Sequence, residues 1–148
     1  MKELKKILGL VFITLLVAGC GGGSSSDNNV PPVDENVIAG EDTNNNGVWD
    51  YLDEYIEKTY PGQENEKLRE ALKENALVEQ EFLLAETKEQ AVAAARKRES
   101  AISKLGDIYS DWRDTYKTSK NFEKALLNTY ERVKKYYEND LKLSGEFF

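Results

Sequence analysis

The sequence contains no histidine and only one cysteine. Histidine is the most frequent general acid or base in enzymes and a frequent zinc ligand, and a disulfide requires two cysteines. Catalysis by a histidine base, by a Ser–His or Cys–His pair, or by a zinc site with histidine ligands is therefore excluded. No disulfide can form within the chain. We expect no enzymatic activity.

An excess of basic residues is also lacking. The chain has 20 lysines and arginines against 27 aspartates and glutamates, which gives a net charge of −7. Residues 1–19 contain three of the lysines and one of the glutamates, so the chain without them has a net charge of −9. Nucleic-acid-binding proteins present an excess of positive charge to the phosphate backbone, so we expect no nucleic acid partner.

Only one long hydrophobic run is present, and it lies at the N-terminus. Three lysines among residues 2–6 precede a run from residue 7 to residue 18 that is apolar except for one glycine and one threonine. This pattern is typical of a signal peptide and is too short for a transmembrane helix. Residues 16–20 read Leu-Val-Ala-Gly-Cys, which resembles the lipobox of bacterial lipoproteins. An ordinary secretory signal with an incidental cysteine is the alternative.

The lipobox resemblance implies that residues 1–19 are removed and that Cys20 is acylated and becomes the new N-terminus. Several acyl chains anchor a protein stably in a membrane, whereas one chain gives only marginal binding. Gly21 follows the cysteine, where an aspartate would signal retention in the inner membrane. The resemblance therefore implies a lipid-anchored protein of the cell envelope, in the outer membrane if the cell is Gram-negative.

Residues 20–40 have the composition of a linker. Three glycines and three serines follow Cys20, and two prolines occur at residues 31 and 32. Such segments form no packed core and behave as flexible coils. We expect a disordered tether whose root-mean-square reach is roughly 25 Å.

Residues 42–53 read Asp-Thr-Asn-Asn-Asn-Gly-Val-Trp-Asp-Tyr-Leu-Asp. Calcium prefers several oxygen ligands, and a twelve-residue loop supplies them from positions 1, 3, 5, 7, 9 and 12, with glycine at position 6 for the sharp turn. Gly47 occupies position 6, and the hydrophobic Trp49 occupies position 8. The candidate ligands are Asp42, Asn44, Asn46, Val48 through its carbonyl, Asp50 and Asp53.

The loop resembles the calcium loops of EF-hands, and more closely those of dockerin-type bacterial proteins, because position 12 is the aspartate Asp53 rather than a glutamate. A dockerin has two such loops and this chain has one, so cohesin binding is not implied. Three formal charges predict a weak site of the extracellular kind, with a dissociation constant of roughly 10⁻⁴–10⁻³ M. The alternative is a simple Asn/Gly turn before a helix, with acids in its first turn.

Helical periodicity begins at Trp49. Apolar residues recur at spacings of three and four over residues 52–59, 68–85, 91–116 and 122–141, without strand-like alternation. Thr87 and Gln90 fit a capping box, which predicts a boundary near residue 87, although one continuous helix is the alternative. Residues 118–121 are interpreted as a turn. We expect an all-α fold: residues 41–60 form the calcium loop and first helix, and residues 61–148 an antiparallel bundle, with three to four helices in all.

Two side-chain groups remain open to a functional interpretation. Aromatic residues at helical spacing are interpreted as core, with a groove for a sugar or a peptide as the alternative; they are Tyr109, Trp112, Tyr116, Phe122, Tyr130 and Tyr137. The basic residues 96–98 are interpreted as a solvated face, with contact to anionic headgroups as the alternative.

The whole arrangement loosely resembles uncharacterised secreted helical proteins of marine bacteria, a resemblance that implies no activity. The sequence thus predicts a membrane-anchored envelope lipoprotein with a structural calcium loop. A calcium-ordered module that binds an envelope protein partner is the first alternative, and an envelope enzyme acting on glycan or peptide is the second.

Overall fold

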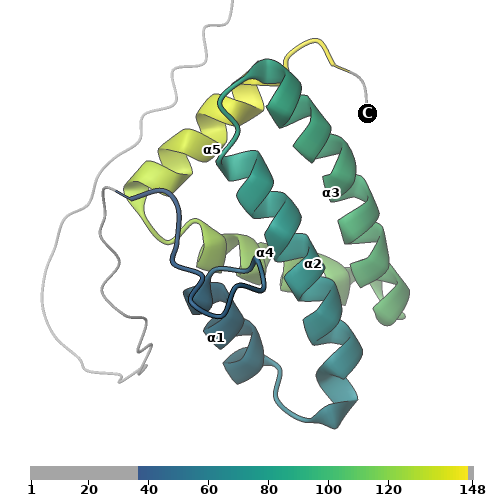
Figure 1. Ribbon diagram of the computed structural model, residues 1–148. Helices are drawn as coiled ribbons and strands as arrows, with labels where there is room; N and C mark the ends of the chain where they lie inside the picture. The colour runs from purple at the N-terminus through teal and green to yellow at the C-terminus, as the bar shows by residue number, and fades with distance from the viewer. Residues whose placement is uncertain (1–36, 147–148) are drawn as a thin grey trace, which may run out of the picture.

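The computed structural model of the chain describes residues 37–146 (Figure 1). The predicted signal peptide, Cys20 and most of the predicted linker lie outside these residues. The described part is all-helical, as the sequence predicts, and contains no strand. Its elements are α1 (Asp50–Thr59), the short 3₁₀ helix η1 (Gln63–Asn65), α2 (Glu66–Leu83), α3 (Lys88–Ile108), α4 (Trp112–Leu126) and α5 (Tyr130–Lys142).

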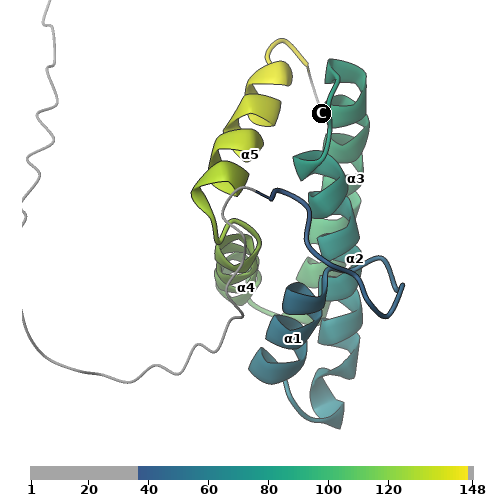
Figure 2. The same ribbon diagram turned by 60° about the vertical axis from the view of Figure 1, so that its left-hand side comes forward.

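Helix α2 is the centre of the bundle. It forms an antiparallel hairpin with α3, the most extensive contact in the fold, and it also contacts α1, α4 and α5 (Figure 1). Helix α1 lies beside the first half of α2, whereas α5 lies near its end. Figure 2 shows α4 nearly end-on, whereas α2, α3 and α5 are seen lengthwise and run up and down the picture, so α4 crosses these helices. None of the helices within residues 37–146 is long and apolar enough to cross a membrane.

The core has two parts. The larger one joins the loop before α1 to α1, α2, α3 and α4, and its members include Trp49, Leu52, Ile56, Leu72, Leu105 and Phe122. The smaller one lies between the last turn of α2 and the first half of α3, where Phe82 packs among the alanines of α3 and against Tyr136 of α5. Fully burying a side chain such as Phe82 stabilises a fold by about 1.5–3 kcal/mol relative to exposing it.

The helix boundary predicted near residue 87 is confirmed, and the alternative of one continuous helix is wrong. Thr87 Oγ1 accepts a hydrogen bond from the backbone N–H of Gln90 (3.2 Å), and Gln90 Oε1 accepts one from the backbone N–H of Thr87 (3.1 Å). This reciprocal capping satisfies donors that the first turn of α3 leaves free. Lys142 of α5 donates to the carbonyls of Ala85 and Glu86 and fixes the connection.

The later boundaries differ from the prediction, and residues 37–146 form five α-helices instead of three to four. The expected third helix ends at Ile108, and the carboxylate of Asp111 accepts from the backbone N–H of Arg113 (2.9 Å) to start α4. The turn expected at residues 118–121 lies inside α4. The actual break follows Leu126, where Thr129 Oγ1 caps α5 by accepting from the N–H of Arg132 (3.2 Å). A side-chain cap begins each new helix, so capping rather than apolar periodicity sets these boundaries.

The aromatic residues interpreted as core are mostly on the surface. Phe122 is buried and Tyr109 is half-buried, but the other four are exposed: Trp112 by 71%, Tyr116 by 59%, Tyr130 by 76% and Tyr137 by 63%. The core interpretation is therefore wrong for these four. The break before α4 and the crossing of α4 leave the common face of Trp112 and Tyr116 without a covering helix.

Candidate metal centre

The loop of residues 42–53 precedes α1 and continues into its first turn (Figure 1, dark blue). Residues 37–49 contain no helix, so the incoming helix of an EF-hand is not found directly before this loop among the described residues. The backbone N–H of Asp50, the first residue of α1, donates to the carbonyl of Glu41 (2.7 Å) and closes the loop at its base.

The turn inside the loop is built around Asp42 and Gly47. The carboxylate of Asp42 accepts the backbone N–H of Asn46 (3.2 Å) and of Gly47 (2.8 Å). Gly47 has φ = 89°, and a Cβ there would approach a methyl carbon of Leu77 to 2.8 Å. Both the left-handed backbone and the close contact require glycine, as the sequence pattern predicts for position 6.

Two asparagine amides and Asp53 converge in the loop. The side-chain amide nitrogens of Asn44 and Asn46 both donate to Asp53 Oδ2, at 3.1 and 2.6 Å. The amide oxygen of Asn44 accepts the N–H of Asn46 (2.9 Å), and that of Asn46 accepts the N–H of Val48 (2.7 Å). The hydrogen bonds of the candidate side chains therefore hold the loop backbone in its turn conformation.

The other oxygen of Asp53 is poorly satisfied. Asp53 Oδ1 is buried and has no hydrogen-bond partner among the described residues, and the closest cation is Lys73 Nζ of α2 at 3.5 Å. A buried carboxylate oxygen without a partner is costly. The amide N–H groups on one oxygen and the ammonium near the other supply the positive charge that Asp53 requires.

The remaining candidates are placed differently. The carboxylate of Asp50 accepts the backbone N–H of Thr43 (3.0 and 3.2 Å) and thus braces the first turn of the loop. Val48 is buried, as is Trp49. Within residues 37–146, no three carboxylate, cysteine or histidine side chains are close enough to share a metal ion. An ion in this loop would therefore depend on the amides of Asn44 and Asn46 and on a backbone carbonyl as well.

Gln80 of α2, which the loop pattern does not predict as a site residue, fixes the loop to the bundle. Its amide nitrogen donates to the carbonyl of Gly47 (2.7 Å), and its amide oxygen accepts the N–H of Trp49 (3.0 Å). A side-chain amide has the same donor and acceptor as a peptide unit, so Gln80 pairs with the loop as a neighbouring strand would. The available signal was its spacing, since Gln80 continues the apolar row of Leu72 and Ala76 at intervals of four.

Arg132 of α5 holds the segment that leads into the loop, and it too was missed. The side chain is fully buried, its Nε donates to the carbonyl of Ile38 (2.8 Å), and its guanidinium lies over the rings of Trp49 and Tyr51, at 5.0 and 4.7 Å. Burial lowers the pKa of Arg132 and raises that of the Tyr51 hydroxyl. The cation–π contacts compensate part of the cost of burying the guanidinium.

The donor chemistry of the loop fits calcium. Carboxylate and amide oxygens have more than one lone pair, so an oxygen that accepts a backbone N–H can still bind a hard cation. Asp53 Oδ1 accepts no hydrogen bond among the described residues, so it is a loop oxygen with lone pairs left for a cation. A bound ion would neutralise the loop carboxylates, and the amide oxygens of Asn44 and Asn46 would be further ligands for it.

Comparison with known proteins finds no matching family model, no similar curated protein and no similar solved structure.

Proposed function

We propose that the chain is a cell-envelope lipoprotein, anchored through acyl chains on Cys20, whose helical domain contains a structural calcium-binding loop. The observation that carries the calcium assignment is the convergence of Asn44 and Asn46 on Asp53, around a turn that the carboxylate of Asp42 holds.

The position of the loop supports a structural rather than a signalling role. Val48 and Trp49 belong to the larger core, so the loop cannot leave the bundle without exposing them. Asp42 lies at the start of the loop and Asp53 in the first turn of α1. An ion bound by both would join the loop to the helix and offset the repulsion between their charges.

Thermal melts of the chain from Gly21 onward, in calcium and in EDTA, test this assignment. For a dissociation constant of about 10⁻⁴–10⁻³ M, about 10 mM calcium stabilises the native state by roughly 1.4–2.7 kcal/mol. A domain of this size gains roughly 4 °C in melting temperature per kcal/mol, so we expect a rise of about 6–11 °C.

The same melts on Asp42→Ala and on Asp107→Ala separate the loop from general charge effects. Asp107 is an exposed aspartate of α3, far along the chain from the loop. We expect Asp42→Ala to lose the calcium-dependent rise and Asp107→Ala to retain it. An equal rise in both variants would refute the ligand assignment.

The lipid anchor is tested by fractionating cells that express the full chain or its Cys20→Ala variant. Wild-type chain is expected in the membrane fraction, with a mass that includes acyl chains on residue 20. The variant is expected to leave that fraction. Membrane association that survives the substitution would contradict anchoring through Cys20.

The exposed aromatic residues favour a second candidate, a calcium-ordered module that binds an envelope protein. Large exposed rings are enriched at interfaces, and four of them lie on α4 and α5. If calcium orders such a surface, light scattering or crosslinking in cells should detect an assembly that EDTA dissolves. A monomer without crosslinks in both conditions would count against this candidate.

A further inference from the structure

A hollow of about 730 Å³ opens where α3 meets α4 and α5. Ile102 and Gly106 of α3 form one side, and α4 forms the other with Trp112, Tyr116 and Ser119. Gly106 has no side chain, and a Cβ there would meet no other atom within 4 Å. The hollow is therefore open to a ligand along the backbone of α3.

Aromatic rings beside this hollow are exposed to solvent. Trp112 and Tyr116 are four residues apart, so they lie on the same face of α4. Both belong to the lining of the hollow although 71% and 59% of their surfaces are exposed. Exposed aromatic faces adjoining a concavity bind ligands that present flat arrays of C–H groups.

The charges at the hollow are already paired. Arg98 Nε lies 2.9 Å from Glu79 Oε1, and the same guanidinium donates to the hydroxyl of Tyr136. Lys120 Nζ lies 2.7 Å from Glu123 Oε2. Both cations of the lining thus have a carboxylate partner, and an anionic ligand would compete with these carboxylates. Electrostatics favour a neutral ligand.

Hydroxyl groups in the lining provide the polar contacts. Ser119 Oγ is buried and lacks a hydrogen-bond partner among the described residues, and Ser110 and Thr115 also line the hollow. A hydroxyl both donates and accepts, so it matches another hydroxyl. An acyl chain would leave these hydroxyls unpaired, whereas a polyhydroxylated ring would pair with Ser110 and Thr115, and with Ser119 once a rotation about χ1 brings its buried oxygen to the surface of the hollow.

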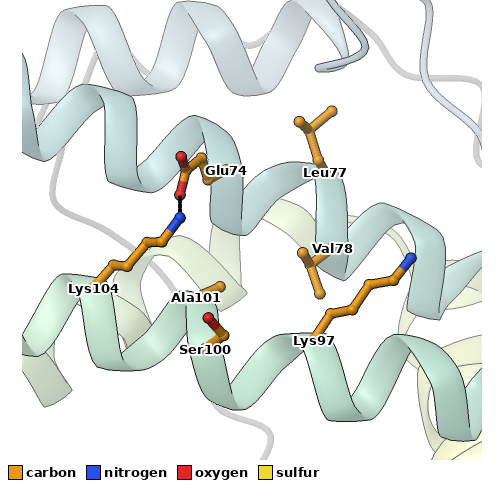
Figure 3. A pocket seen from close by; sticks show the side chains of 7 residues that line it. All are labelled: Glu74, Leu77, Val78, Lys97, Ser100, Ala101 and Lys104. Atoms are coloured by element: carbon orange, nitrogen blue, oxygen red, sulfur yellow. Dashed lines mark hydrogen bonds and ion pairs between the residues drawn. The ribbon is translucent and has the colours of Figure 1, made fainter.

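We propose that this hollow binds a neutral saccharide, with sugar rings stacked on Trp112 and Tyr116 and a sugar hydroxyl bonded to Ser119. Another hollow, between α2 and α3, lacks these features (Figure 3). It measures about 350 Å³, has no aromatic ring, and its lysines reach across to glutamates of α2, as Lys104 does to Glu74.

Titration of the chain from Gly21 onward with maltotriose, cellotriose, xylotriose and chitotriose tests the proposal. Trp49 is buried and Trp112 is exposed, so a shift of tryptophan emission to shorter wavelength reports burial of Trp112. We expect at least one of these sugars to cause a saturable shift. Calorimetry should show that Trp112→Ala weakens binding by at least about tenfold.

Tyr130→Ala is the matched control, because Tyr130 is equally exposed but does not line the hollow. We expect it to bind as the wild type does, and Ser119→Ala to bind several-fold more weakly. Absence of saturable binding to all four sugars would overturn the proposal, as would unchanged affinity in Trp112→Ala. Binding of a fatty acid or a polyuronate in place of these sugars would also overturn it.

Discussion

Replacement of Gln80 by leucine removes the two hydrogen bonds that fix the loop to α2. Gln80 is only 5% exposed, and leucine has a similar volume, so the substitution leaves no large cavity. The N–H of Trp49 loses its acceptor in a buried position, and the carbonyl of Gly47 loses its donor in a partly buried one. The main effect is therefore the cost of leaving these backbone groups unpaired.

The size of that effect follows from their burial. A buried donor without a partner costs about 1–3 kcal/mol, and a partly exposed carbonyl that water can reach costs less, about 1 kcal/mol. We expect the free energy of unfolding to fall by roughly 2–4 kcal/mol and the melting temperature by about 8–16 °C. Calcium affinity should fall as well, because the loop that presents the ligands loses its support.

The assay is thermal unfolding followed by circular dichroism, first in EDTA and then in calcium. Gln63→Leu is the matched control, because Gln63 is exposed in η1 and the substitution introduces the same leucine at the surface. We expect the control to melt within about 2 °C of the wild type, as surface substitutions usually do. Equal melting temperatures for Gln80→Leu and Gln63→Leu would refute the reasoning.

Three further predictions concern single side chains. Lys73→Gln removes an ammonium 3.5 Å from Asp53 Oδ1, so calcium titration should show affinity up to about fivefold higher. Gly47→Ala forces a left-handed residue against Leu77, so melts should show a loss of about 1–3 kcal/mol and weaker calcium binding. Burial raises the pKa of Glu79 above its ordinary value of 4.5 despite the nearby guanidinium of Arg98. The contribution of Glu79 to stability therefore falls as the pH rises above 4.5. Melts in EDTA should therefore show that Glu79→Gln becomes more stable relative to the wild type as the pH rises above 4.5, and a pH-independent difference would contradict this.

The sequence predicts local features of this fold well. The glycine at position 6 of the loop, the start of α1 and the capping box at Thr87 each depend on neighbouring residues only. Gly47 has the positive φ that the pattern requires, and Thr87 and Gln90 make both expected hydrogen bonds. Such features need no knowledge of distant contacts.

The misplaced features depend on tertiary structure. Asp111 and Thr129 start new helices, but similar polar residues also occur inside the helices, so neither stands out in the apolar period. Spacing shows that Trp112 and Tyr116 share a face, but not which helix covers it. The contacts of Gln80 and Arg132 join segments 31 to 94 residues apart, and no local pattern reveals them.

The basic run at residues 96–98 illustrates the same point. Arg96 and Lys97 are exposed, as expected of a solvated face. Arg98 is instead half-buried, lies over the ring of Phe82 at 4.6 Å and pairs with Glu79. One residue of difference along a helix turns a side chain by about 100°, so adjacent charges have different environments.

Terbium luminescence tests the calcium loop most directly. Terbium has a size and an oxygen preference close to those of calcium, and it emits when an excited tryptophan lies near it. Trp49 is part of the loop, whereas Trp112 lies on α4. We predict terbium emission that disappears when calcium displaces the terbium. Trp112→Phe should retain this emission, whereas Trp49→Phe and Asp42→Ala should each lose it. Emission that persists in Asp42→Ala, or that calcium does not reduce, would contradict the assignment of a calcium site to this loop.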